Sequence, residues 1–272
     1  FAENKGELAE QQQFVNLDYA TTKAEKAFVI GSNFGPYTHE KYKKQYEVLF
    51  GKMEDVSFRD KMSFDLFNQT LKNVRYAPDI AFEGKWEKNI KNSNNIVISV
   101  INLETRQELA AYKDIYEKGI ADICLHHINK NEKIFLVSLC QQEGDDLACK
   151  RINDILNQNN KRFVEVINYN SIDRTIELFA SAKKIYATRF HALMMGLYFH
   201  KNIVPIIYNE KGINAIKSYC RPLKWFSIEN FDEKTLHQMT KIEQTAELEL
   251  PASRQFQGLL EYYRLRWCNN DI

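Results

Sequence analysis

Cysteine, proline and glycine are all scarce in this chain of 272 residues, which holds five cysteines, five prolines and ten glycines. The cysteines form no C-x-x-C pair and are widely scattered, at Cys124, Cys140, Cys149, Cys220 and Cys268. This spacing argues against a zinc site or a disulfide framework and is typical of a reducing cytoplasm, where we expect the protein to act. So few prolines and glycines leave no low-complexity linker.

Long apolar runs and an excess of charge are absent as well. No run approaches the roughly 18 apolar residues that a transmembrane helix needs, so we expect no membrane span. The formal net charge is +1, which gives no electrostatic footprint for nucleic acid as a partner. Hydrophobic residues make up 44% of the chain, enough for one large domain or two domains with buried cores.

Short apolar segments alternate with helical patterns along most of the chain. Strands are predicted at residues 27–30, 56–58, 96–101, 134–137, 163–167, 185–187 and 203–207. Helices are predicted at residues 38–51, 61–68, 106–129, 145–157 and 171–181. A further helix is predicted to start at residue 188, another to end at about residue 219, and a last one to lie near residues 251–267. This alternation predicts an α/β fold with parallel, doubly wound sheets.

A charged, Asn-rich segment at residues 83–95 is the candidate linker between domains. We therefore expect a first domain over residues 1–88 and a second over residues 89–250. The remaining residues, 251–272, are predicted to form a terminal helix that packs back across the domains.

The stretch from Lys183 to Leu197 carries the most distinctive chemistry. It predicts a buried strand that turns into a helix at Thr188, whose hydroxyl is suited to an N-cap. Arg189 and His191 then fall in the first turn, where the helix dipole and unpaired N–H groups favour an anion. In open α/β sheets, ligands bind at such strand ends. A purely structural role for the Arg-x-His pattern is about equally compatible with these residues alone.

Further candidates follow two earlier strands. Gly31, Ser32 and Asn33 come after the first strand, where glycine allows a tight turn and a close approach of the backbone to a ligand. Arg59 is a second arginine at a strand end, with an ion pair to Asp60 or a neighbouring carboxylate as its structural alternative. Other histidines, including the His126–His127 pair, have no partners at ligand spacing and are interpreted as structural.

Five segments together resemble the polysaccharide pyruvyl transferase family, in order and in rough spacing: residues 29–36, 56–63, 77–82, 187–192 and 205–211. The resemblance extends from about residue 27 to residue 220. It implies two Rossmann-like domains of the GT-B type, with the site in the cleft between them. Because that family has a further N-terminal half-domain, the resemblance implies that the first domain is incomplete at its N-terminus.

The resemblance implies transfer of pyruvate from phosphoenolpyruvate onto a sugar hydroxyl pair, giving a pyruvate ketal in bacterial capsule, exopolysaccharide or cell-wall polymer synthesis. Arg59 and Arg189 are then expected as cationic clamps from opposite domains, with Lys211 adding a point charge. His191 is expected to act as an acid–base group or to contact phosphate. Asp60 or Glu143 is a candidate proton acceptor, and Gly31, Ser32 and Asn33 are expected to bind substrate.

Phosphoenolpyruvate is expected as co-substrate, with no other cofactor and no metal. The acceptor sugar is carried on a lipid or a nucleotide, and a lipid carrier leaves open a peripheral association with a membrane. Two other functions stay open. A sugar-nucleotide-dependent glycosyltransferase of the same fold would use Arg189 and Lys211 to hold a nucleotide diphosphate. A non-catalytic binding module would leave Arg59 far from Arg189.

Overall fold

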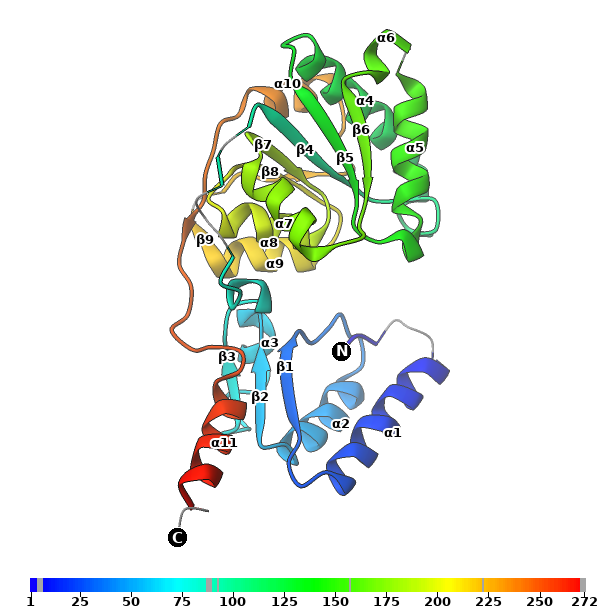
Figure 1. Ribbon diagram of the computed structural model, residues 1–272. Helices are drawn as coiled ribbons and strands as arrows, with labels where there is room; N and C mark the ends of the chain where they lie inside the picture. Colours follow the sequence, from blue (N-terminus) through cyan, green and yellow to red (C-terminus); the bar gives the residue numbers. More distant parts are fainter. Residues whose placement is uncertain (4–6, 87–89, 92, 157, 222, 270–272) are drawn as a thin grey trace. The chain divides into compact units, whose positions relative to one another are not determined.

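The computed structural model describes residues 1–3, 7–86, 90–91, 93–156, 158–221 and 223–269 (Figure 1). The chain divides into two compact units. Unit 1 consists of Phe1–Gly84 together with Glu249–Ile272, and unit 2 consists of Lys85–Leu248. Unit 1 is therefore built from both ends of the sequence.

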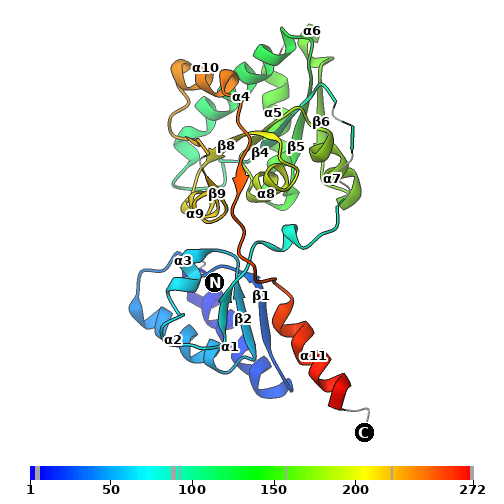
Figure 2. The ribbon, with the colours of Figure 1, turned by 90° about the vertical axis from the view of Figure 1, so that its left-hand side faces the viewer.

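Unit 1 has a three-stranded parallel sheet in its described residues, in the order β1-β2-β3. The strands are β1 (Phe28–Ser32), β2 (Asp55–Phe58) and β3 (Val74–Tyr76). The helices are α1 (Glu7–Lys23), α2 (Glu40–Gly51), α3 (Lys61–Asp65), the short 3-10 helix η1 (Ile80–Phe82) and α11 (Gln257–Asn269). Figure 2 shows α2 and α11 on opposite sides of this sheet.

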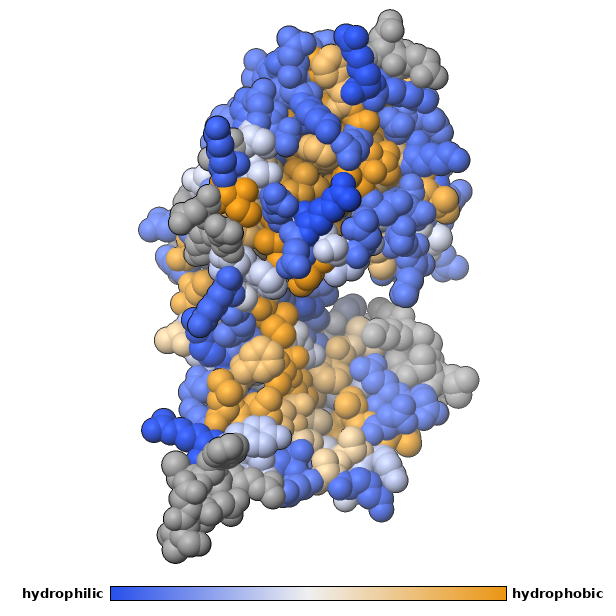
Figure 3. Space-filling model, viewed as in Figure 1, coloured by the Kyte–Doolittle hydropathy of each residue, from blue (hydrophilic) through white to orange (hydrophobic). Residues whose placement is uncertain are grey.

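Aromatic side chains fill the core of unit 1 between the sheet and α2. Phe34, Phe50, Phe58 and Phe67 are all buried, and the centroids of the Phe34 and Phe67 rings lie 5.0 Å apart, edge to face. Each such ring buries a large apolar area, and pairs in this geometry add further stabilisation. Figure 3 shows that apolar side chains also gather on the visible face of unit 1, around its strands.

The segment before α11 is fastened to unit 1 by Gln255, which is completely buried. Its Oε1 accepts a hydrogen bond from the Gly31 backbone N–H at 2.7 Å. Its Nε2 donates to the carbonyl oxygens of Ala77 (3.0 Å) and Pro78 (2.8 Å). One amide side chain thus satisfies three backbone groups at the ends of β1 and β3.

Unit 2 has a six-stranded parallel sheet within the described residues, in the order β10-β8-β7-β4-β5-β6. The strands are β4 (Asn95–Val100), β5 (Lys133–Ser138), β6 (Val164–Asn168), β7 (Lys184–Ala187), β8 (Asn202–Ile207) and β10 (Phe226–Ser227). The first strand, β4, lies beside the fourth, β7, and successive strands extend outward from each. The direction of winding reverses between β4 and β7, as in Rossmann folds.

Helices cover both faces of this sheet (Figure 1). The helices of unit 2 are α4 (Lys113–Ile128), α5 (Asp145–Ile155), α6 (Gln158–Lys161), α7 (Ile172–Ser181), α8 (Phe190–Tyr198), α9 (Glu210–Tyr219) and α10 (Glu233–Lys241), with 3-10 turns η2 (Ala110–Tyr112) and η3 (Gln141–Glu143). Buried side chains of α4, α5 and α10 form one core with the sheet. A short antiparallel pair, β9 (Cys220–Arg221) and β11 (Glu247–Leu248), lies apart from the sheet.

The predicted strands are all present, whereas several helix bounds differ. The helix predicted over 106–129 begins at Lys113, because Arg106–Tyr112 forms turns instead. The helix predicted over 61–68 ends at Asp65, and α5 ends at Ile155, with residue 157 outside the described residues. Strands β3 and β9 to β11 and helices α6 and α10 were not predicted.

The N-cap predicted at Thr188 is wrong. Helix α8 begins at Phe190, its N-cap is Arg189 in an extended conformation, and no side chain caps the helix there. The Thr188 hydroxyl is instead 3.2 Å from the hydroxyl of Tyr116, in the interior. Across the described residues, no helix combines the length and apolar character that crossing a membrane requires.

Candidate functional site

A pocket of about 460 Å³ opens in unit 2 where β5, β7 and β8 end. It is lined by Arg106, Leu139, Cys140, Glu143, Ala187, Thr188, Arg189, Phe190, His191, Leu193, Ile207, Tyr208, Asn209, Lys211 and Gly212. The pocket lies at the carboxyl ends of parallel strands, beside the point where the winding reverses. This is where ligands bind in open α/β sheets.

The floor of the pocket is fixed from strand β4. The buried Ser99 Oγ accepts hydrogen bonds from the backbone N–H groups of both Thr188 and Arg189, each at 3.0 Å. The Tyr116 hydroxyl in turn accepts a hydrogen bond from the Ile101 N–H at 3.3 Å. Complete burial raises the pKa of Tyr116 well above its ordinary value, so this hydroxyl stays neutral. These contacts hold the β7–α8 junction to the neighbouring strand.

Arg189 is held by two carboxylates. Its Nε donates to Asp145 Oδ2 at 2.7 Å, its Nη2 donates to Asp145 Oδ1, and its Nη1 donates to Glu143 Oε2 at 2.7 Å. Burial alone would lower the pKa of Arg189, but Asp145 and Glu143 outweigh it and raise that pKa. The predicted anion clamp is thus already engaged with acidic groups of the chain itself.

Glu143 connects Arg189 to a second arginine, Arg106. The same Oε2 of Glu143 also accepts a hydrogen bond from Arg106 Nη2. The Arg106 guanidinium lies over the ring of Tyr208, 5.1 Å from its centroid, in cation–π geometry. Partial burial favours the neutral form of Glu143, yet the hydrogen bonds and charges of the two arginines outweigh this and lower its pKa.

The predicted residues His191 and Lys211 line the same pocket as Arg189. His191 is exposed in the first turn of α8. Lys211 is in the first turn of α9, which is capped by the Asn209 side chain, and its Nζ lies 4.9 Å from the centroid of the Phe190 ring. Three of the predicted site residues therefore converge on one pocket wall.

The other predicted site residues lie together in unit 1. Arg59 donates to Asp79 Oδ2 at 2.9 Å and to Asn33 Oδ1 at 3.0 Å. Gly31 has a positive φ of 66°, which glycine adopts without strain. Its N–H is bound to Gln255, and Ser32 accepts the Arg59 N–H through its carbonyl oxygen at 2.8 Å. Arg59, at the carboxyl end of β2, is thus oriented by two side chains that follow β1 and β3.

Two acidic residues of unit 1 have structural roles. Asp60 caps α3 by accepting a hydrogen bond from the Ser63 N–H at 2.8 Å, and Arg59 forms an ion pair with Asp79. The buried Asp79 also accepts a hydrogen bond from the Ala81 N–H at 3.0 Å. The capping role of Asp79 was predicted from its place after Pro78, whereas the cap formed by Asp60 was not.

His127 belongs to a buried polar network at the opposite end of the sheet from the pocket. Its Nδ1 is 2.6 Å from Glu132 Oε2 and its Nε2 is 2.8 Å from the Tyr186 hydroxyl. Burial lowers the pKa of His127 to about 4, although the Glu132 carboxylate acts in the opposite direction. In the described part of the chain, no group of three or more His, Cys, Asp or Glu side chains is placed to hold a metal ion.

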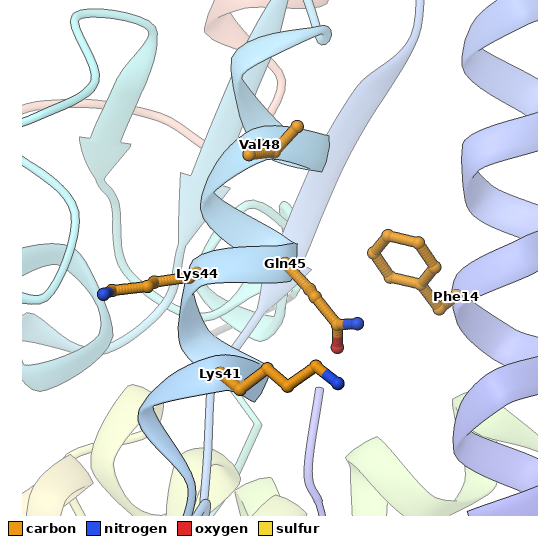
Figure 4. Close-up of a pocket in the computed structure, with 5 residues that line it drawn as sticks. All are labelled: Phe14, Lys41, Lys44, Gln45 and Val48. Atoms are coloured by element: carbon orange, nitrogen blue, oxygen red, sulfur yellow. The ribbon is translucent and has the colours of Figure 1, made fainter.

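A second hollow, of about 570 Å³, lies in unit 1 between α1 and α2 (Figure 4). Phe14 of α1 points toward α2, and Gln45 points back toward α1. Lys41, Lys44 and Val48 of α2 complete its lining. Among its lining residues that the structure describes, the titratable groups are two exposed lysines.

The sequence also matches a known family over most of its length. Residues 4–210 match the family described as polysaccharide pyruvyl transferase. This chain belongs to that family. The family predicted from the five short segments is therefore confirmed.

One relative of this chain is the amylovoran biosynthesis protein AmsJ of Erwinia amylovora. The two are 21% identical over 232 residues, which cover 77% of this chain and 56% of AmsJ. The chain thus spans just over half the length of that relative. The family is one of transferases by its description, and the relative is described as a biosynthesis protein for amylovoran.

Solved structures with a similar fold include two epimerases. The UDP-GlcNAc 2-epimerase from Methanocaldococcus jannaschii gives a TM-score of 0.64 at 9% identity, over 93% of this chain and 74% of the epimerase. A putative UDP-N-acetylglucosamine 2-epimerase from Listeria monocytogenes gives 0.53 at 9% identity, over 99% and 82%. At this identity the likeness shows the fold alone. The predicted α/β class with two Rossmann-like domains of the GT-B type is confirmed.

Sequence reasoning missed four side chains of the pocket and its supports: Ser99, Arg106, Asp145 and Tyr208. Ser99 interrupts an otherwise apolar strand, which is a signal for a buried hydrogen bond. Tyr208 directly follows β8, within one of the five segments that resemble the family. Arg106 was hidden because it was assigned to a helix that begins seven residues later.

Proposed function

We propose that this chain carries the phosphoenolpyruvate site of a transferase that forms a pyruvate ketal on a pair of sugar hydroxyls during the synthesis of a bacterial surface polysaccharide. The observation that carries the proposal is that Arg189, His191 and Lys211 line one pocket at the carboxyl ends of the strands of unit 2. The family membership supplies the type of reaction.

The charges of the pocket suit this donor. Phosphoenolpyruvate bears a phosphate and a carboxylate, and the pocket offers the guanidinium groups of Arg106 and Arg189 and the ammonium group of Lys211. Guanidinium groups match the geometry of both anions with paired donors. The N-terminus of α8, where no side chain caps the helix, adds partial positive charge from its first turn.

The reaction needs a proton donor and an anion-stabilising site. A proton added to the vinyl carbon of phosphoenolpyruvate leaves positive charge on the adjacent carbon, which one sugar hydroxyl attacks as it loses its proton. Phosphate then leaves, and the second hydroxyl closes the ring as its proton passes to solvent or phosphate. We assign His191 to proton transfer or to the leaving phosphate, because imidazole titrates near neutral pH.

In unit 1 the proposal assigns Arg59 to an anionic group of the substrates and Gly31, Ser32 and Asn33 to substrate contacts. Asn33 and Asp79 orient the Arg59 side chain, and a guanidinium held in a fixed orientation loses less entropy when it binds an anion. A metal is not part of this assignment, because cationic side chains perform the charge stabilisation.

The test is thermal unfolding of the chain with and without phosphoenolpyruvate, for the parent, Lys211→Ala and Lys217→Ala. Lys217 lies on the same helix, α9, but does not line the pocket, so it is a matched control for the loss of one charge. A ligand at a hundred times its Kd stabilises the folded state by about 2.7 kcal/mol. We expect a shift of about 5 °C in the parent and in Lys217→Ala, and a much smaller shift in Lys211→Ala.

A shift with a nucleotide sugar and none with phosphoenolpyruvate would replace this proposal with the sugar-nucleotide-dependent glycosyltransferase. Equal shifts in all three proteins would move the donor away from this pocket. No shift with either ligand would overturn the assignment of the pocket as a donor site.

A further inference from the structure

One carboxylate oxygen serves two arginines in the pocket. Oε2 of Glu143 accepts a hydrogen bond from Arg189 Nη1 at 2.7 Å and another from Arg106 Nη2. Two guanidinium groups therefore converge on a single oxygen atom. Guanidinium groups repel each other unless an anion lies between them, so this convergence indicates an anion-binding site.

Glu143 does not satisfy all the hydrogen-bond donors of this anion-binding site. Arg106 Nε is buried and, within the described residues, has no hydrogen-bond partner. A buried charged donor left without an acceptor costs free energy. An anion presenting two or three oxygens can accept from Nε and Nη2 of Arg106 and from Nη1 of Arg189 at once, which the single Oε2 of Glu143 does not do.

The two acidic partners of Arg189 are held very differently. Asp145 is completely buried and also accepts hydrogen bonds from the backbone N–H groups of Asn102 and Cys140, each at 3.1 Å. Glu143 is at the end of the single turn η3, and its side chain is 46% exposed. Rotation of the Glu143 side chain into solvent therefore requires no change in the backbone, whereas Asp145 is fixed.

We propose that Arg106 and Arg189 form a paired-guanidinium anion site, that Glu143 occupies this site while substrate is absent, and that the phosphate or carboxylate of the donor displaces it. The identification of the displacing anion as phosphoenolpyruvate rests on the proposed function; the two-arginine site and its resident carboxylate do not.

Charge explains why displacement matters for affinity. Two carboxylates, Asp145 and Glu143, balance the two guanidinium groups while Glu143 is in place. An incoming anion must first compete with Glu143, so its apparent affinity is reduced by the fraction of molecules in which the site is occupied. Removal of the Glu143 charge should abolish this competition.

The experiment compares Glu143→Gln with Glu104→Gln by isothermal titration of phosphoenolpyruvate and, separately, of inorganic phosphate. Glu104 is a half-exposed carboxylate 3.3 Å from Arg151 and does not line the pocket, so it controls for the loss of one acidic partner of an arginine. We expect Glu143→Gln to bind phosphoenolpyruvate about tenfold more tightly than the parent, and Glu104→Gln to match the parent.

Arg106→Lys in the Glu143→Gln background tests the second arginine. Lysine keeps the positive charge but lacks the planar fork, so the gain in affinity should be lost. Glu143→Ala, which shortens the side chain at the same exposed position, repeats the test if the glutamine side chain forms a new hydrogen bond. Melting temperatures without ligand check that each variant is folded.

If Glu143→Gln binds phosphate more tightly than the parent does, and neither the parent nor any variant binds phosphoenolpyruvate, this inference stands and the proposed donor is overturned. Phosphoenolpyruvate binding of equal strength in the parent and in both Glu143 variants would overturn this inference and keep the proposed donor. Weaker binding in both Glu143 variants would show that Glu143 supports the ligand, which is the opposite of the displacement proposed.

Discussion

Arg189 and Asp145 form a two-pronged ion pair, with the guanidinium Nε 2.7 Å from Oδ2 and Nη2 bound to Oδ1. The two residues are 44 positions apart in the sequence and join the N-cap of α8 to the first residue of α5. The aspartate is completely buried and the arginine side chain is 11% exposed. The pocket wall thus depends on one aspartate that does not itself line the pocket.

Asp145→Asn should destabilise the fold and weaken anion binding together. The amide leaves only Glu143, which Arg106 shares, to compensate the buried guanidinium, and loss of one partner of a buried pair costs about 3 kcal/mol. Urea unfolding measures the loss, and titration with phosphoenolpyruvate measures the affinity. Asp146→Asn changes the neighbouring charge in the same turn of α5 and should leave both values within about 0.5 kcal/mol of the parent.

Ser99→Ala should lower the free energy of unfolding by about 2 kcal/mol, because two backbone N–H groups at the β7–α8 junction lose their acceptor. Ser138→Ala is the matched control. Ser138 is also completely buried, at the end of β5, but within the described residues its hydroxyl has no hydrogen-bond partner. Its removal should be neutral or stabilising, and equal losses for both variants would contradict the assigned role of Ser99.

Acid should destabilise the protein through His127. The folded state lowers the pKa of His127 from 6.5 to about 4, so between these values the unfolded chain binds a proton that the folded chain does not. The free energy of unfolding should therefore fall as the pH drops through this window, by about 3 kcal/mol in total. Measured from pH 7.5 to 3.5, this slope should shrink in His127→Gln and persist in His237→Gln, whose histidine is exposed.

The groups around His127 set this expectation. Glu132 lies 2.6 Å from Nδ1 and is itself bound to Lys183, while Tyr186 lies 2.8 Å from Nε2. The charge of Lys184, buried nearby, and that of His126 disfavour a second positive charge at His127. An unchanged slope in His127→Gln would mean that carboxylates, not this histidine, control the acid response.

Gln255→Ala should destabilise unit 1 by about 3 kcal/mol, because the Gly31 N–H and the carbonyl oxygens of Ala77 and Pro78 lose their buried partner. Gln257→Ala offers the control: its side chain binds Glu261 on the exposed surface of α11, at 2.9 Å. Urea unfolding followed by tyrosine or tryptophan fluorescence distinguishes the two. A control variant as unstable as Gln255→Ala would place the effect in the helix rather than in the buried amide.

The sequence predicted the strands well because each is a short apolar run between polar segments, and a run such as Ile96–Val100 has no competing interpretation. Helix starts were harder. At Thr188 the local pattern favoured an N-cap, but the hydroxyl is bound to Tyr116, 72 residues away. A tertiary hydrogen bond of this kind leaves no trace in the spacing of neighbouring residues.

Only the site residues next to predicted strand ends could be found from the sequence. Arg189 and His191 are adjacent to a recognisable strand end, and Lys211 follows the next one, so parallel-sheet geometry brings them to one edge. Arg106 and Asp145 arrive from a loop and a neighbouring helix. Their places depend on how unit 2 packs, which the local sequence around each does not encode.

The position of Gln255 constrains the order in which the chain acquires its structure during synthesis. Unit 2 is complete once Leu248 has been made, whereas the buried amide that closes the sheet of unit 1 is added several residues later. Unit 1, although it is begun first, waits for a residue made after all of unit 2. We therefore expect unit 2 to reach its final form before unit 1 during synthesis, the reverse of the usual order in which the N-terminal domain folds first.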